Sequence, residues 1–222
     1  MRALALPAVG AVLLSGCAPS GDIFDRPLGA NPSAFIAAEI AFARLAQDKG
    51  QWTAFRETAA PDAVMFVPQR VNARDWLRSK KDPATAVRWQ PHAVFVSCDG
   101  NVGATTGAWQ NGPAQGYFTT LWRRDPVRGE MRWVLDHGDA LRAPREAPDF
   151  IESRQAACGS RPSAAPVGDA DGDTVAGLSP DQTLSWTSTV RSDGSRRVSV
   201  HMWDGTAMTP VIDDQVAAPD KP

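Results

Sequence analysis

The clearest structural pattern in the chain lies in residues 87–139, VRWQPHAVFVSCDGNVGATTGAWQNGPAQGYFTTLWRRDPVRGEMRWVLDHGD. Four runs rich in aromatic and β-branched residues are separated by turn sequences, Asp-Gly-Asn, Asn-Gly-Pro and Asp-Pro-Val-Arg-Gly. Such turns between alternating runs are typical of antiparallel hairpins. The pattern therefore predicts four consecutive antiparallel strands, at residues 87–97, 102–110, 115–124 and 130–139.

The residues before these strands carry helical patterns. Apolar residues between Phe35 and Leu45 recur at the helical period, and Gly50 follows them as a stop signal. We expect three N-terminal helices at residues 33–49, 51–58 and 72–79, with a short strand at 63–67. Helices followed by an antiparallel meander predict an α+β fold in which the sheet wraps over the helices.

The composition changes after residue 143. Residues 144–181 predict one helix, from about Pro148 to Cys158, followed by a linker rich in Pro, Gly, Ala, Ser and Asp. Residues 182–217 predict a β-hairpin, with strands at 183–190 and 197–203 around a Ser-Asp-Gly-Ser turn. Because two strands alone are marginally stable, we expect a third strand at 208–216, or docking on the main domain, to complete this appendage.

The first residues have the features of a secretory leader. Arg2 precedes an apolar run that is too short to span a membrane, and small residues follow it. The run ends in Leu-Ser-Gly-Cys17, which resembles the lipobox of bacterial lipoproteins, so residues 1–16 are expected to be a signal peptide and Cys17 the lipidated N-terminus. Residues 17–32 then form a tether, and Ala18 resembles the sorting pattern of outer-membrane lipoproteins facing the periplasm. The alternative is an ordinary cleavable leader with an incidental cysteine.

Charge and cysteine content exclude several classes of protein. With 23 basic and 25 acidic residues, the net charge of −2 offers no excess for neutralising a nucleic-acid backbone. With Cys17 assigned to lipid, Cys98 and Cys158 remain, and in an oxidising periplasm they are candidates for a disulfide; the alternative is two free or buried thiols. Neither lies near other Cys or His residues at zinc spacing. Asp169, Asp171 and Asp173 lack the glycine and glutamate of a calcium loop, so we expect no metal.

Several segments together resemble a known superfamily: AEIAFARLAQDKG, PDAVMFVP, VSCDGNVGATTGAW, GYFTTLWRRD and EMRWVLDHGD. Their order is similar to that of the nuclear-transport-factor-2-like (NTF2-like, cystatin-like) proteins, in particular the domain of unknown function 4440, which is related to SnoaL polyketide cyclases and ketosteroid isomerases. The resemblance covers residues 33–143 and implies a cone of three N-terminal helices packed on a curved antiparallel sheet, with an apolar cavity at its wide end. In the enzymes of this superfamily, a carboxylate or His in the cavity moves a proton, assisted by Tyr or a protonated acid.

The candidate site residues follow from that resemblance and from strand alternation. Asp136 and His137 end the last strand of the meander, and alternation places them on opposite faces, so only one points inward unless a bulge intervenes. Tyr117 is the candidate for supplying a hydroxyl. Each of the four strands also carries a tryptophan; most are expected in the core, and one or two lining the cavity would favour flat apolar ligands: Trp89, Trp109, Trp122 and Trp133.

The preferred functional interpretation is a lipid-anchored periplasmic protein that binds a small apolar ligand or an envelope partner without catalysis. The chain has only three histidines and one tyrosine, which is few for acid–base chemistry. The alternative is a SnoaL-type isomerase, dehydratase or cyclase with Asp136 or His137 as base and Tyr117 as donor. A third hypothesis has the C-terminal hairpin pairing with another protein. No cofactor is expected, and homodimer formation stays open.

Overall fold

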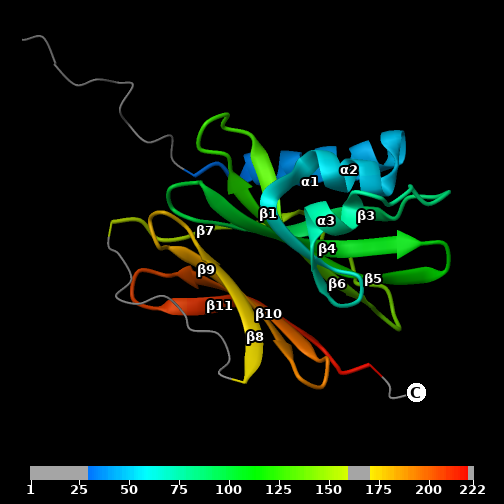
Figure 1. The fold of residues 1–222 in the computed structure, drawn as a ribbon. Helices are drawn as coiled ribbons and strands as arrows, with labels where there is room; N and C mark the ends of the chain where they lie inside the picture. Colours follow the sequence, from blue (N-terminus) through cyan, green and yellow to red (C-terminus); the bar gives the residue numbers. More distant parts are fainter. Residues whose placement is uncertain (1–29, 160–170, 220–222) are drawn as a thin grey trace, which may run out of the picture.

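The computed structural model describes residues 30–159 and 171–219. Within these residues there are three helices and eleven strands, which Figure 1 shows in chain order. The helices are α1 (Pro32–Lys49), α2 (Gln51–Thr58) and α3 (Ala73–Leu77). The strands are β1 (Ala59–Phe66), β2 (Arg70–Asn72), β3 (Arg88–Val96), β4 (Val102–Asn111), β5 (Ala114–Arg124), β6 (Met131–Ala140), β7 (Glu152–Gln155), β8 (Gly172–Leu178), β9 (Leu184–Arg191), β10 (Arg196–Trp203) and β11 (Met208–Val216).

The strands form two sheets. The larger has seven strands in the order β2-β1-β6-β5-β4-β3-β7, and the smaller has four in the order β11-β10-β9-β8. Strands β3 to β6 form the predicted antiparallel meander, and β1 joins it by pairing parallel to β6. Helices α1 and α2 lie over one face of the large sheet, and the small sheet lies on its other side (Figure 1). The architecture is α+β, as predicted, and its layers are helices, large sheet and small sheet.

Helix α1 is the only long helix among the described residues, with 18 residues against eight in α2 and five in α3. It begins after Asn31, whose side chain accepts a hydrogen bond from the Ser33 amide at 3.1 Å, and a proline follows in the first turn. It ends at Gly50, which has a φ of 106°. The expected trio of helices is therefore one long helix with two short ones, and α3 is little more than a single turn.

The core between the helices and the large sheet is aromatic. Phe42 of α1 lies at its centre, with its ring centroid 4.8 Å from that of Phe55, 4.9 Å from Trp89 and 5.9 Å from Trp122. These contacts are edge-to-face, the arrangement that aromatic rings prefer. The packing fixes α1 and α2 against the meander and leaves α2 at one end of the sheet.

The helix expected from Pro148 to Cys158 is wrong. Residues 144–151 are irregular, and Glu152–Gln155 form strand β7, which pairs parallel to β3 between Ala93 and Val96. Without β7, the outer edge of β3 would leave its backbone N–H and C=O groups without partners in the sheet. Pairing along that edge therefore outweighs the weak local preference of this short segment for a helix.

The linker expected up to residue 181 is also wrong in its last part. Gly172–Leu178 form strand β8, which pairs antiparallel to β9 along its whole length. The appendage is therefore a four-stranded sheet instead of a hairpin or three strands. The two predicted hairpin strands and the third strand at 208–216 correspond to β9, β10 and β11. Alternation in β8 is weak because four of its seven residues are Gly, Ala or Thr, so its sequence resembles a linker.

Some predicted features lie outside the described residues. These are the signal peptide at 1–16, Cys17, nearly all of the tether at 17–32 and Asp169 of the acidic triplet. Within the part of the chain that the structure describes, no helix has the length and apolar character needed to cross a membrane.

Candidate functional site

A pocket of about 260 Å³ opens between α2 and the face of the large sheet that the helices cover. We call it the α2 pocket. Its walls are mainly aromatic and aliphatic, two amides lie among its lining residues, and one lining residue is acidic. The lining residues are Gln51, Phe55, Val87, Trp89, Trp109, Asn111, Ala114, Phe118 and Asp136. A concave apolar site with a few polar groups is the usual form of a small-molecule site.

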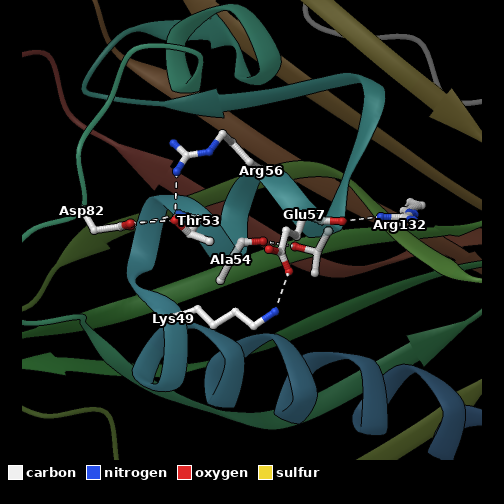
Figure 2. A network of polar contacts seen from close by, with 8 residues as sticks. Lys49, Thr53, Ala54, Arg56, Glu57, Asp82 and Arg132 are labelled. Carbon is white, nitrogen blue, oxygen red and sulfur yellow. Dashed lines mark hydrogen bonds and ion pairs between the residues drawn. The ribbon is translucent and has the colours of Figure 1, made fainter.

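Helix α2 supplies one wall of the pocket and is held by polar contacts on its outer side (Figure 2). The backbone N–H of Thr53 donates to Asp82 Oδ1 at 2.9 Å, and the Thr53 hydroxyl donates to Asp82 Oδ2 at 2.6 Å. Arg56 donates to the Leu77 carbonyl at 2.9 Å. These bonds hold α2 in place from one side. The other side of the helix carries Phe55, which lines the pocket.

The junction between α1 and α2 requires a glycine. Gly50 has a φ of 106°, and a Cβ at this position would collide with the Asp82 carboxylate that caps α2. The glycine therefore allows Asp82 to reach the first turn of α2, and it places Gln51 at the pocket mouth. There Gln51 Oε1 accepts a hydrogen bond from the Val87 amide at 3.2 Å, which joins α2 to the segment before β3.

Asp136 of β6 is the acidic group of the pocket. Its Oδ2 accepts one hydrogen bond, from the Thr120 hydroxyl at 3.2 Å. Burial, and then the negative charge of Glu39, raise the pKa of Asp136 to about 8, against the bond from Thr120 that lowers it. At pH 7 the Asp136 carboxyl is therefore mostly protonated, so it can donate a hydrogen bond into the pocket.

Glu39 of α1 is fully buried behind the pocket wall. Its carboxyl accepts hydrogen bonds from Trp89 Nε1 at 2.6 Å, Trp122 Nε1 at 2.9 Å and the Thr105 hydroxyl at 2.5 Å. Burial raises the pKa of Glu39 above its ordinary value, and these hydrogen bonds oppose that rise without cancelling it. Glu39 thereby ties α1 to three strands of the meander and orients the Trp89 ring that lines the pocket.

The four strand tryptophans divide into two pairs. Trp89 and Trp109 line the α2 pocket, whereas Trp122 and Trp133 are buried in the core. The Trp109 ring lies against Gly116, where a Cβ would collide with it. This close approach requires a glycine at position 116, and both Trp89 and Trp109 contribute to the pocket wall.

His137 and Tyr117 do not belong to the α2 pocket. Both face the small sheet, with the Tyr117 hydroxyl 3.5 Å from His137 Nε2 and Arg196 Nε 3.4 Å from His137 Nδ1. Burial, and then the charge of Arg196, lower the pKa of His137 to about 3, so its imidazole is neutral. Burial raises the pKa of Tyr117. The candidates Asp136, His137 and Tyr117 therefore do not converge on one cavity.

The layer between the two sheets contains buried apolar side chains, such as Val198 and Val200, together with a polar group. We call the polar residues the inter-sheet cluster: Tyr117, Thr119, His137, Arg196 and Asp214. The Thr119 hydroxyl of β5 donates to Asp214 of β11 at 2.7 Å. Arg196 of β10 donates to the Gly138 carbonyl at 2.9 Å, and its guanidinium lies 4.9 Å from the centre of the Phe66 ring. These contacts are satisfied within the protein, so the cluster joins the sheets instead of presenting a site.

Cys98 and Cys158, which are 60 positions apart in sequence, form a disulfide with a Cα–Cα distance of 5.4 Å. It joins the end of β3 to the segment after β7. The neighbouring Cys98 amide donates to the Thr183 hydroxyl at 2.8 Å, so the small sheet is attached at the same point. No group of three or more His, Cys, Asp or Glu side chains within residues 30–159 and 171–219 is placed to hold a metal ion.

Sequence reasoning missed the part of the site that the helices supply. Glu39 lies four residues after Phe35 and three before Phe42, so its carboxyl belongs to the apolar face of α1. A charged residue on that face is the signal that could have identified it. Gln51 and Asn111 have no comparable signal, because amides at helix ends and turns are common on any surface.

Neither protein-family models nor curated proteins match the sequence. Solved structures resemble about half of the chain. A cystatin-like fold protein from Burkholderia xenovorans LB400 is 13% identical, with a TM-score of 0.40; the match covers 50% of this chain and 92% of that protein. An NTF2-like protein of unknown function from Shewanella oneidensis MR-1 is 12% identical, with a TM-score of 0.39 and coverages of 48% and 96%.

A third similar structure is the beta subunit of the benzoate 1,2-dioxygenase from Burkholderia mallei ATCC 23344. It is 18% identical, with a TM-score of 0.38, and the match covers 50% of this chain and 91% of that subunit.

Proposed function

We propose that residues 33–143 form an NTF2-like domain whose α2 pocket binds a small, flat, uncharged molecule. The observation that carries the proposal is the position of Asp136, a protonated carboxyl within a pocket lined by Trp89, Trp109 and Phe118. Flat aromatic walls favour a flat apolar ligand, and one carboxyl supplies a single polar anchor. A pocket of about 260 Å³ suits a molecule of one or two fused rings.

Binding without catalysis fits the distribution of polar groups. A proton-transfer enzyme needs a base and a separate hydrogen-bond donor at the reacting atom. Here Tyr117 and His137 lie on the opposite face of the sheet from Asp136. The remaining polar side chains of the pocket are the amides of Gln51 and Asn111 near its mouth.

Titration calorimetry of the full chain with 2-naphthol, a flat uncharged probe, tests this proposal. Ala114 lines the pocket, so Ala114→Leu is expected to weaken binding at least tenfold by filling it. The matched control is Ala84→Leu, at an exposed position away from the pocket, which should leave binding unchanged. Equal affinities in wild type and Ala114→Leu would overturn the proposal, as would complete absence of binding.

A second candidate function is proton transfer at a carbon acid, as in a SnoaL-type isomerase. The observation in its favour is the pKa of Asp136 near 8, which lets this carboxyl gain and lose a proton close to neutral pH. Hydrogen–deuterium exchange at the carbon beside a cyclic ketone carbonyl distinguishes the two functions. Exchange by wild type that disappears in Asp136→Asn would establish catalysis, whereas equal exchange rates favour binding alone.

We also propose that the protein is lipid-anchored through Cys17 at the periplasmic face of the outer membrane. The support is the Leu-Ser-Gly-Cys sequence after the apolar leader run. Cys17→Ser is expected to move the protein from the membrane fraction to the soluble fraction and to abolish labelling by a clickable fatty acid. An envelope protein is the alternative occupant of the pocket, and crosslinking from Asn111, at the pocket mouth, would capture it.

A further inference from the structure

The hydrogen-bond partners of Glu39 differ in number from those of Asp136. Glu39 accepts from two indole N–H groups and from the hydroxyl of Thr105. The Thr105 contact, at 2.5 Å, falls within the range of hydrogen bonds from a hydroxyl to an ionised carboxylate. Indole N–H groups can only donate, so they favour an ionised acceptor.

Asp136 has one hydrogen bond, the bond from Thr120 at 3.2 Å. Thr105, Thr120 and Asp136 lie directly opposite one another on β4, β5 and β6, so the Glu39 carboxyl bonded to Thr105 and the Asp136 carboxyl bonded to Thr120 lie on the same face of the sheet. Two carboxyls in one buried region repel each other when both are ionised, and the pair then holds one proton. The group with more donors keeps the negative charge, and that group is Glu39.

Asp139 of β6 lies an odd number of residues from Asp136 and so faces the other side of the sheet. The remaining charged groups on α2, β1, β5 and β6 are occupied elsewhere. On α2, Arg56 donates to the carbonyls of Leu77 and Lys80, and Glu57 pairs with Lys49 of α1 at 3.6 Å (Figure 2). Two further pairs lie at the surface of β1, β5 and β6: Asp62 with Arg123 at 2.7 Å, and Arg132 with Glu130 at 2.5 Å.

We propose that Glu39 is a positioning residue that carries the single negative charge of the pair, keeps the proton on Asp136, and thereby makes the α2 pocket select ligands that accept a hydrogen bond. The first half of this proposal, the assignment of the charge to Glu39 and of the proton to Asp136, concerns only the protein. The second half, the preference for ligands that accept a hydrogen bond, rests on the proposed function. The charge of Glu39 is the second largest cause of the raised pKa of Asp136, after burial, which agrees with this assignment.

Carboxyl carbon chemical shifts of the full chain, measured by NMR between pH 5 and pH 9, test the first half without any ligand. We expect Glu39 to be ionised and Asp136 protonated at pH 7. Glu39→Gln removes the charge with little change in shape and should lower the pKa of Asp136 by at least one unit. Glu57→Gln, which removes an exposed carboxylate from α2, is the control and should leave it unchanged.

Two results would overturn the role of Glu39. One is a protonated Glu39 in the wild-type chain at pH 7, a measurement that needs no variant to fold. The other is an unchanged pKa of Asp136 in folded Glu39→Gln. Neither depends on ligand binding, so failure here is distinct from failure of the proposed function.

The acceptor preference is tested with two probes of similar shape, 2-naphthaldehyde and 2-methylnaphthalene. One added hydrogen bond to the Asp136 carboxyl should tighten binding of the aldehyde about tenfold. That preference should disappear above pH 9, where Asp136 is ionised. Equal affinities for the two probes at pH 6 would overturn the ligand preference. The charge assignment would not be affected, because the NMR measurement tests it separately.

Discussion

Asp136 and His137 are consecutive residues of β6, and their side chains lie on opposite faces of the large sheet. Asp136 lines the α2 pocket, and His137 is 2% exposed, with Arg196 of the small sheet 3.4 Å from its Nδ1. Asp136 is half-buried and His137 is buried, and both are held mainly in their uncharged form at neutral pH. The same strand therefore provides a polar group to the pocket and a neutral ring to the contact between sheets.

Asp136→Asn should make the protein less sensitive to alkaline pH. The pKa of Asp136 is about 8 in the folded state against an ordinary value of 3.8 in the unfolded chain, so the folded state binds more protons between these values. Stability therefore falls as pH rises through this window, by at most about 1.4 kcal/mol per pH unit from this group.

Urea unfolding of wild type and Asp136→Asn at pH 5 and pH 9 measures this effect. We expect the variant to gain at least about 2 kcal/mol relative to wild type on going from pH 5 to pH 9. The same pH dependence in both proteins would contradict a protonated Asp136 in the folded state.

His137→Phe should reduce the sensitivity to acid. The pKa of His137 is about 3 in the folded state against an ordinary value of 6.5 in the unfolded chain, so the unfolded state binds more protons between these values. The stabilising effect of the neutral ring is present above pH 6.5 and is lost as pH falls toward 3. Phenylalanine keeps the edge-to-face contact with Phe66, whose centroid is 5.4 Å away.

Stability of the wild type and His137→Phe is compared by urea unfolding at pH 7 and pH 4.5. The variant should recover about 1 to 3 kcal/mol relative to wild type at the lower pH. NMR of the His137 ring should show no titration above pH 5, and a ring that titrates near pH 6.5 would rule out the prediction.

The central meander follows from local signals. Alternation in residues 87–139 and the Gly-containing turns specify which strands pair, and the observed registers join consecutive strands. The same alternation separates Asp136 from His137. It also separates Tyr117 from Asp136. Tyr117 pairs with Asp139, which lies three residues after Asp136 on β6, so the side chains of Tyr117 and Asp136 point to opposite faces of the sheet.

The remainder depends on contacts that sequence patterns do not carry. Strand β7 exists because β3 has an open edge, and no local signal in Glu152–Gln155 identifies the edge it joins. Glu39 is stabilised by donors from residues 50, 66 and 83 positions away in sequence. A single sequence shows that Glu39 lies on an apolar helix face, but the partners that make its burial tolerable come from tertiary packing.

Arg196→Ala should weaken the attachment of the small sheet to the large one. Arg196 donates to the Gly138 carbonyl at 2.9 Å and covers the Phe66 ring. Its loss leaves that carbonyl without this donor and removes a cation–π contact, so we expect a loss of about 2 kcal/mol. Arg128→Ala, at an exposed turn, is the control and should change stability by less than about 0.5 kcal/mol.

Chemical denaturation followed by tryptophan fluorescence measures the Arg196 effect, because Trp186 and Trp203 lie in the small sheet and Trp122 and Trp133 in the large one. A loss of stability equal to that of Arg128→Ala would show that Arg196 does not hold the sheets together.

Reduction of the Cys98–Cys158 disulfide should destabilise the protein substantially. The bond closes a loop across 60 residues, and it lies where β3, the segment after β7 and Thr183 meet. In the chain-entropy model, opening a loop of this length costs about 4 kcal/mol because the unfolded chain gains conformational freedom. Unfolding in urea with and without reductant, followed by circular dichroism, measures the difference.

The double variant Cys98→Ser with Cys158→Ser should match the reduced wild type, and adding reductant to it should have no effect. Because the bond joins the end of β3 to the segment after β7, and the Cys98 amide donates to Thr183 just before β9, we expect the loss to appear first in the exchange protection of β7 and β9, with the meander protected longer. If the reduced and oxidised proteins had the same free energy of unfolding, the disulfide would not contribute to stability and the prediction would be wrong.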